Sequence, residues 1–113
     1  MATQSPIFVK TEAFMVWLLN HTGKFPKDER FRLAKRIDDA LFDFHKSLTQ
    51  AAYETSAKAH LRQADLHLQL LRAYLRLALE LKYSSPDQFR CAAEHLDEIG
   101  KLLGGWMKKA LLG

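Results

Sequence analysis

The sequence of 113 residues offers little to support disulfide bonding, export or membrane insertion. Its single cysteine, Cys91, cannot form an internal disulfide, so a reducing compartment is expected. The first ten residues lack the basic segment of an export signal. The apolar run from Phe14 to Leu19 is six residues long, whereas a helix needs about 20 to span a bilayer. These absences predict a cytoplasmic protein that does not enter a membrane.

The sequence also lacks the motifs of common catalytic and metal sites. It contains no HExxH pair, no glycine-rich phosphate loop and no serine elbow. His60, His67 and Tyr74 recur every seven residues, which favours a packing face over a metal site. An acidic cluster has basic neighbours as ordinary helix ion-pair partners, and it comprises Asp38, Asp39 and Asp43. We therefore expect no catalytic residue, no metal and no cofactor.

Proline is scarce, and its three positions, 6, 26 and 86, all fall at boundaries between segments. Asn20 to Gly23 closes a first segment, and Phe25-Pro26 opens a second with two acidic residues near its start. The next breaks lie at residues 53–56 and 83–86. The last of these is a capping box, in which Ser85 and Gln88 cap a helix that has proline at its first position. Four segments without internal breaks result.

Hydrophobic spacing identifies these segments as helices. Apolar residues follow alternating three- and four-residue steps, which is the pattern of a helical bundle seam. In the second segment they are Ala34, Ile37, Leu41, Phe44, Leu48 and Ala51. In the third they are Leu61, Ala64, Leu68, Leu71, Leu75 and Ala78, and in the fourth Phe89, Ala92, Leu96, Ile99, Leu103, Trp106 and Ala110. The first segment is less regular, although Phe14, Trp17, Leu18 and His21 share one face. The prediction is an all-α, antiparallel up-down-up-down four-helix bundle that forms one domain over residues 1–113.

The third segment carries a second apolar stripe, about 150° from its core stripe at roughly 100° per residue. This outer leucine stripe consists of Leu66, Leu70, Ala73, Leu77 and Leu81. A helix in a lone bundle needs only one such stripe, so the outer one would be left in water. It indicates either a very wide core contact or an interface with another subunit. We favour the interface.

The third segment also holds most of the excess positive charge. Residues 57–82 have five basic and two acidic residues, whereas residues 26–54 and 86–113 are each neutral. Four of these cations share one helical face and form a basic row, which consists of Lys58, Arg62, Arg72 and Arg76. Such a row is either a solvated face or a binding surface for phosphate or carboxylate groups. Three further lysines in the second half of the fourth segment either complement the helix dipole or extend that surface: Lys101, Lys108 and Lys109.

Two smaller features point to contacts between helices. Phe31, Phe42 and Tyr53 are spaced eleven residues apart and form an aromatic column, which suits helix or subunit contact better than base stacking. Gly100 and Gly104 lie four residues apart inside the fourth segment, where glycine costs about 1 kcal/mol relative to alanine. That spacing suits the close approach of another helix or of a ligand.

The second half of the chain resembles the accessory variability determinant (Avd) proteins of diversity-generating retroelements. The resemblance rests on Leu-Arg-x-Tyr-Leu-Arg-Leu at residues 71–77, Gly-Lys-Leu-Leu-Gly-Gly-Trp at residues 100–106, and the Ser-Pro helix start between them. FPKDERF at residues 25–31 is similar to a turn of the wider four-helix-bundle family, which includes proteins encoded by intervening sequences of ribosomal RNA genes.

The resemblance implies a non-enzymatic partner of the retroelement reverse transcriptase that supports mutagenic cDNA synthesis and retrohoming. It also implies a basic, barrel-like homopentamer that binds template RNA or other nucleic acid. The row on the third segment could contact RNA, DNA or the transcriptase, since positive charge suits all three. The alternative is a stand-alone bundle of the intervening-sequence type, with a structural or partner-binding role.

Overall fold

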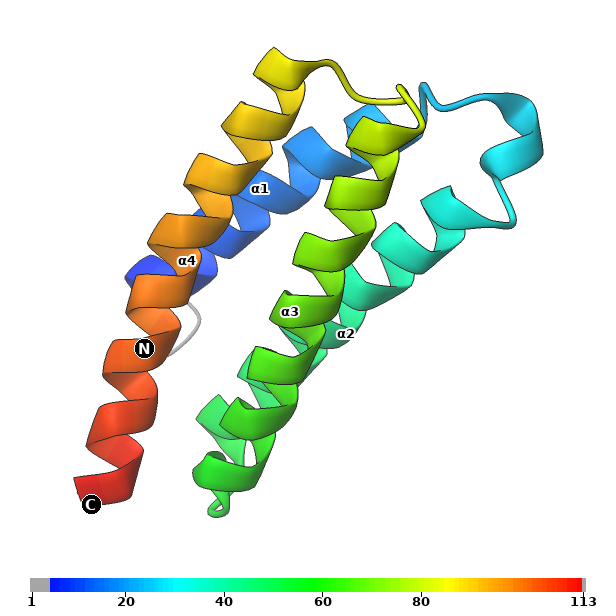
Figure 1. The fold of residues 1–113 in the computed structure, drawn as a ribbon. Helices are drawn as coiled ribbons and strands as arrows, with labels where there is room; N and C mark the ends of the chain where they lie inside the picture. Colours follow the sequence, from blue (N-terminus) through cyan, green and yellow to red (C-terminus); the bar gives the residue numbers. More distant parts are fainter. Residues whose placement is uncertain (1–4, 113) are drawn as a thin grey trace.

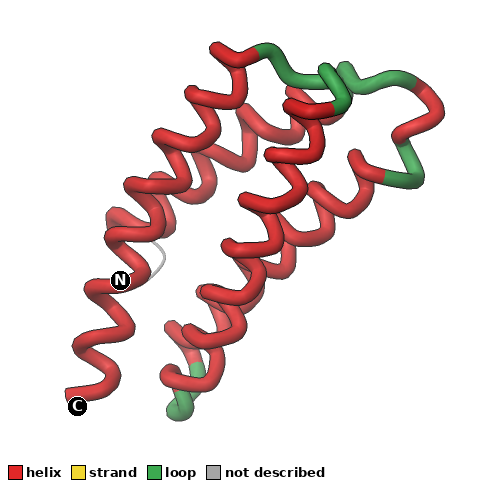
Figure 2. Tube along the Cα trace, viewed as in Figure 1, coloured by secondary structure: helices red, strands yellow, loops and turns green. Residues whose placement is uncertain are grey.

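The structure, a computed structural model, describes residues 5–112, with only the backbone described for Leu112. These residues form four α-helices and one short 3-10 helix, and they contain no strand. The α-helices are α1 (Pro6–Thr22), α2 (Leu33–Tyr53), α3 (Ala57–Glu80) and α4 (Pro86–Leu112), and η2 (Lys27–Glu29) lies between the first two. Figures 1 and 2 show the α-helices running alternately up and down. The predicted four-helix, up-down-up-down arrangement is confirmed.

Each helix packs against two neighbours, in the cyclic order α1, α2, α3, α4 and back to α1. In Figure 1 the start of α1 lies beside the C-terminal half of α4, and α2 lies beside α3. Polar contacts at the surface join three of these pairs. They are Glu12–His45 between α1 and α2 at 2.9 Å, Arg72–Asp97 between α3 and α4 at 3.0 Å, and Lys10–Glu98 between α1 and α4 at 3.2 Å.

The predicted seams form the core of the bundle. All six positions of the α2 seam are at most 6% exposed, and all six of the α3 seam are at most 3% exposed. On α4 the four central positions are buried, whereas Phe89, Trp106 and Ala110 are half-buried near the helix ends. On α1, Phe14, Leu18 and His21 are buried and Trp17 is half-buried. The helical period therefore identified the core positions of α2, α3 and the centre of α4, whereas on α1 it missed the buried Ile7 and Phe8.

The predicted start of the second helix was wrong. Phe25-Pro26 precedes η2, and α2 begins only at Leu33. Arg32 interrupts the helix because its backbone angles, φ −115° and ψ −109°, are not helical. Glu29 is buried and accepts a hydrogen bond from the amide of Leu33, which supplies a partner for an N–H at the first turn of α2. The interruption thus lets a side chain from the loop serve the start of the helix.

The turn between α3 and α4 is defined by hydrogen bonds at both of its ends. After α3, the amides of Lys82 and Tyr83 donate to the carbonyls of Leu79 and Ala78, which is a Schellman motif with Lys82 at φ 65°. Before α4, the amide of Gln88 donates to the Ser85 hydroxyl at 3.1 Å, and the amide of Ser85 donates to the Gln88 side chain at 2.8 Å. The predicted capping box is therefore present.

Candidate nucleic-acid and partner interface

The basic row follows the line along which α3 packs against α4. Lys58 and Arg62 line a depression of about 220 Å³ together with the apolar end of α4. Arg72 lines a second depression, of about 410 Å³, with Asp65, Gln69, Asp97 and Lys101. Arg72 and Arg76 line a third, of about 60 Å³. The row therefore lies in a series of shallow depressions, and Lys101 of α4 joins it.

Arg72 differs from the other members of the row because it has hydrogen-bond partners among the described residues. Its guanidinium donates to the Asp97 carboxylate at 3.0 Å and to the carbonyl of Leu96 at 3.1 Å. A β-carbon built on Gly100 would lie 3.3 Å from the Arg72 guanidinium, so this glycine leaves room for it. Arg72 thus ties α3 to α4. The sequence did not predict this role, since only the fold brings α4 beside the row.

The remaining cations of the row are available to a ligand. Lys58, Arg62, Arg76 and Lys101 are exposed, and none of them forms an ion pair within the described residues 5–112. Five cations and two carboxylates, Asp65 and Asp97, line the depressions. Together the depressions therefore carry a net positive charge, with the excess at the two ends of the line, because Asp65 and Asp97 balance Arg72 and Lys101 in the middle depression. Phosphate oxygens fit such a surface because arginine binds them with two parallel hydrogen bonds.

The three lysines of α4 do not share one site. Lys101 lines both the depression beside Arg72 and a larger groove between α1 and α4, of about 540 Å³. Lys109 lines only that larger groove, and Lys108 is exposed. At about 100° per residue, Lys108 projects within some 20° of Lys101. Lys101 therefore lies both beside the basic row and at the α1–α4 groove, and Lys109 lies at the groove. Lys108 is exposed on nearly the same side of α4 as Lys101.

The outer leucine stripe is on the surface of the chain. Leu66, Leu77 and Leu81 are each 50% exposed, and Leu70 and Ala73 are half-buried. A wide contact with the core of the same chain, which was the alternative interpretation, would have buried them. The described residues therefore do not cover the stripe. An interface with another molecule requires such an uncovered apolar surface.

The aromatic column of α2 and the loop before it is also exposed, with Phe31 at 78%, Phe42 at 51% and Tyr53 at 73%. Two residues of the other sequence features have ion-pair partners. His60 contacts Glu54 at 3.0 Å, and Lys35 pairs with Asp39 at 2.7 Å. No group of three or more potential metal ligands occurs in the described part of the chain.

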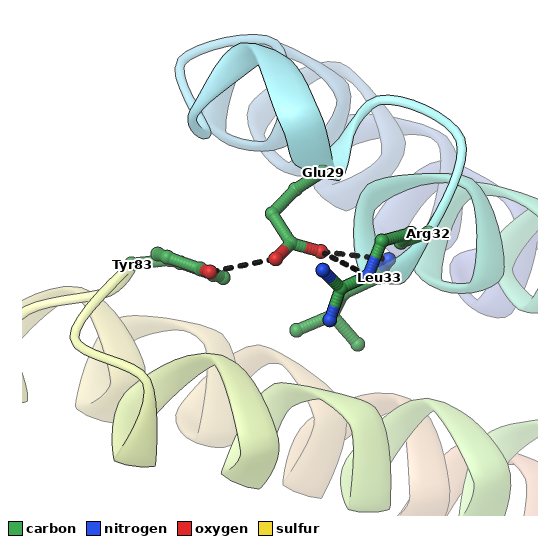
Figure 3. Close-up of polar contacts among 4 residues, drawn as sticks. All are labelled: Glu29, Arg32, Leu33 and Tyr83. Atoms are coloured by element: carbon green, nitrogen blue, oxygen red, sulfur yellow. Dashed lines mark hydrogen bonds and ion pairs between the residues drawn. The ribbon is translucent and has the colours of Figure 1, made fainter.

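A polar cluster around the buried Glu29 joins the loop before α2 to the turn before α4 (Figure 3). The Tyr83 hydroxyl donates to the Glu29 carboxylate at 2.6 Å, and Arg32 lies 3.6 Å from the same carboxylate. The hydrogen bond from Tyr83 lowers the pKa of Glu29 below its usual value and raises that of Tyr83. Because the acceptor is an ionised side chain with little exposure, the contact holds the two loops together. From the sequence alone, Glu29 was only one of two acidic residues near the start of the second segment.

A second buried contact lies in the same region. His21 Nε2 and the Ser84 hydroxyl are 2.7 Å apart, and both residues are buried. Burial, followed by the nearby charge of Lys24, lowers the pKa of His21, so the neutral ring is favoured. His21 also stacks on Trp17 and meets Phe25 edge to face. These neighbours make the pair part of the packing between α1 and the turn before α4.

Comparison with known proteins identifies the family. The model of the bAvd-like family matches residues 7–110, which is nearly the whole chain. No curated protein matches the sequence. None of the described helices is both long and apolar enough to cross a bilayer. Because the family match begins in α1 and ends in α4, the chain belongs to the bAvd-like family.

Proposed function

We infer that this chain is a non-enzymatic accessory protein of a diversity-generating retroelement, which binds the reverse transcriptase and template RNA or cDNA. Membership of the bAvd-like family indicates an accessory protein of the retroelement type. The observation that carries the binding function is the line of free cations between α3 and α4. The protein supports mutagenic cDNA synthesis and retrohoming by bringing transcriptase and nucleic acid together.

The nucleic-acid surface consists of the three free cations of the row, Lys58, Arg62 and Arg76, together with Lys101 of α4. Lys108 extends it, because this lysine and Lys101 project from nearly the same side of α4. Arg72 contributes charge to the surface, but its guanidinium is already bound to Asp97 and Leu96. Contacts to phosphate oxygens give affinity without base specificity, so the binding should depend steeply on salt.

The outer leucine stripe makes the contact between subunits of a homo-oligomer, and five subunits are what the resemblance to Avd proteins implies. The support is that Leu66 and Leu77 are half exposed on the face of α3 opposite its core, and that Leu81, which directly follows α3, is half exposed as well. Repetition of the basic surface around such an assembly would strengthen its attraction for nucleic acid, because the fields of the subunits add.

The nucleic-acid surface is tested by replacing Lys58, Arg62 and Arg76 with alanine and measuring RNA binding at several salt concentrations. Loss of three phosphate contacts should weaken binding and reduce the slope of log K against log salt by roughly 2, at ~0.7 per contact. The control removes equal charge elsewhere, by alanine at Lys27, Arg36 and Lys46, which are exposed outside the row. An equal loss in both variants would show that net charge, and not the row, binds RNA.

The subunit interface is tested by Leu70→Glu and Leu77→Glu, with mass measured by light scattering. Each introduced carboxylate would be buried without a partner in the assembly, so each variant should fall to the mass of a single chain. Val16→Glu is the matched control, since Val16 is 65% exposed on α1 and lies outside the stripe. Co-purification of wild-type protein with the retroelement's reverse transcriptase then tests the accessory role directly.

A further inference from the structure

Two glycines of α4 have no steric reason within the chain to be glycine. A β-carbon built on Gly104 or Gly105 meets nothing within 4 Å, whereas one on Gly100 meets Arg72. Both glycines lie inside a 27-residue helix, where each costs about 1 kcal/mol relative to alanine. Gly100 is therefore explained by contacts of this chain, and the other two are not.

Gly105 lies in a groove of about 540 Å³ between the start of α1 and the C-terminal half of α4. Ligand pockets have volumes of roughly 300–1,000 Å³, so the groove can hold several side chains. Its walls are mainly apolar, and they include Pro6, Ile7, Leu102 and Trp106. Trp106 is half-buried and contacts Phe8 across the groove, with ring centroids 6.3 Å apart. A partly exposed tryptophan in an apolar groove is typical of protein interfaces.

The charges at the groove have one sign. Lys101 and Lys109 line it, no acidic residue does, and neither lysine forms an ion pair within the described residues. The two lysines are eight residues apart, which corresponds to about 12 Å along α4 at 1.5 Å per residue. Carboxylates at positions i and i+8 of a second helix would have the same separation. The absence of a side chain at Gly105 leaves space for that helix between the lysines.

We propose that the α1–α4 groove binds an acidic amphipathic helix of a protein partner. Apolar side chains of that helix contact Trp106 and Leu102, and its carboxylates pair with Lys101 and Lys109. A nucleic acid fits this groove less well, because its walls offer few hydrogen-bond donors to phosphates. The assignment rests on the proposed function for the existence of a protein partner, and it places the surface for that partner beside the basic row between α3 and α4, with Lys101 at the border of the two.

The experiment measures binding of a labelled synthetic peptide by fluorescence anisotropy. The peptide is a 16-residue helix-forming sequence with leucines on one face and glutamates at positions i and i+8 beside them. A second peptide has lysines in place of the two glutamates, and a third has the same composition in scrambled order. The acidic helix should bind wild-type protein about tenfold more tightly than either control, and salt should weaken it.

Two leucine variants distinguish the groove from the rest of α4. Gly105→Leu fills the groove and should weaken binding of the acidic peptide about tenfold. Gly104→Leu is the matched control, because Gly104 also has free space but does not line the groove, and its affinity should stay within about twofold of wild type. Both substitutions raise helix propensity, so folding is retained, and circular dichroism checks it. Lys109→Glu should weaken the acidic peptide and strengthen the lysine peptide.

Three results would overturn the proposal. Equal binding of the acidic and scrambled peptides would remove the chemical basis of the site. Equal effects of Gly104→Leu and Gly105→Leu would remove its location. A Gly105→Leu protein that changed oligomer mass or lost RNA binding, with peptide binding intact, would assign the groove to a second copy or to nucleic acid. Co-purification with the transcriptase is then compared among wild type, Gly104→Leu and Gly105→Leu. If the accessory function fails, the wild-type protein does not capture the transcriptase. If only the groove assignment fails, the wild-type protein captures it and Gly105→Leu captures it equally well.

Discussion

Helix α3 has two apolar stripes with nearly the same residue types and spacing but different surroundings. The inner stripe, from Leu61 to Ala78, is at most 3% exposed, whereas the three outermost leucines of the other stripe are each 50% exposed. Periodicity finds both stripes equally well. Burial depends on which stripe has a neighbour, and α2 and α4 both pack on the inner side. Hydrophobic spacing therefore identifies a surface that needs a partner, and the fold decides whether the same chain supplies it.

The largest effect that tests this comparison comes from shortening one leucine on each side of α3. Leu68 is 2% exposed, so Leu68→Ala should lower the free energy of unfolding by about 2–5 kcal/mol, because the lost side chain leaves a cavity. Leu77→Ala removes a half-exposed side chain and should cost less than about 1 kcal/mol in a single chain. Urea unfolding of both variants, monitored by circular dichroism, measures the difference.

The result depends on the oligomer in an informative way. If Leu77→Ala costs as much as Leu68→Ala in the assembled protein, but not in the Leu70→Glu background, the outer stripe is buried between subunits. If Leu77→Ala and Leu68→Ala cost the same free energy of unfolding in both backgrounds, the difference in burial between Leu68 and Leu77 would be contradicted. A small cost for Leu77→Ala in both would leave the stripe exposed in solution.

Features that depend on neighbouring residues in sequence were predicted well. The seam positions of α2 and α3, the breaks between helices at residues 53–56 and 83–86, and the Ser85–Gln88 capping box all follow from local spacing and local hydrogen bonding, although α3 ends at Glu80, before the second break. The start of α2 was wrong because its determinant is not local. Glu29 is held by Tyr83, which is 54 residues away in sequence. No pattern within the second segment contains that contact.

The candidate site shows the same division. The basic row on α3 was visible from helical spacing, because all its members belong to one helix. The pairing of Arg72 with Asp97, the addition of Lys101 and the α1–α4 groove each require two helices to be placed side by side. The sequence could supply the charges, but the register between helices decides which of them are already paired.

The second prediction sharpens the comparison within the basic row. Arg72→Ala removes a contact to Asp97 and one to the Leu96 carbonyl, so it should lower the free energy of unfolding by about 1 kcal/mol. Arg76→Ala removes an exposed side chain and should change it by less than about 0.5 kcal/mol. In RNA binding the order should reverse, since only Arg76 has a free guanidinium. Unfolding and RNA titration of the same two proteins measure both quantities, and an arginine that ranks first in both would contradict the division of roles.

The smallest expected effect concerns the glycines of α4. The free energy of unfolding shows whether such a glycine is next to a side chain of the same chain or next to another subunit. Gly104→Ala adds a methyl group in open space and should raise the free energy of unfolding by roughly 0.5–1 kcal/mol through helix propensity. Gly100→Ala gains the same propensity but brings a β-carbon to 3.3 Å from Arg72, so its net change should be smaller. Thermal unfolding at low protein concentration compares the two variants. If Gly104→Ala were instead destabilising, and only at concentrations where the oligomer forms, another subunit would approach α4 at that glycine. A loss at every concentration would contradict the open space around Gly104, because no contact within the chain would then explain it.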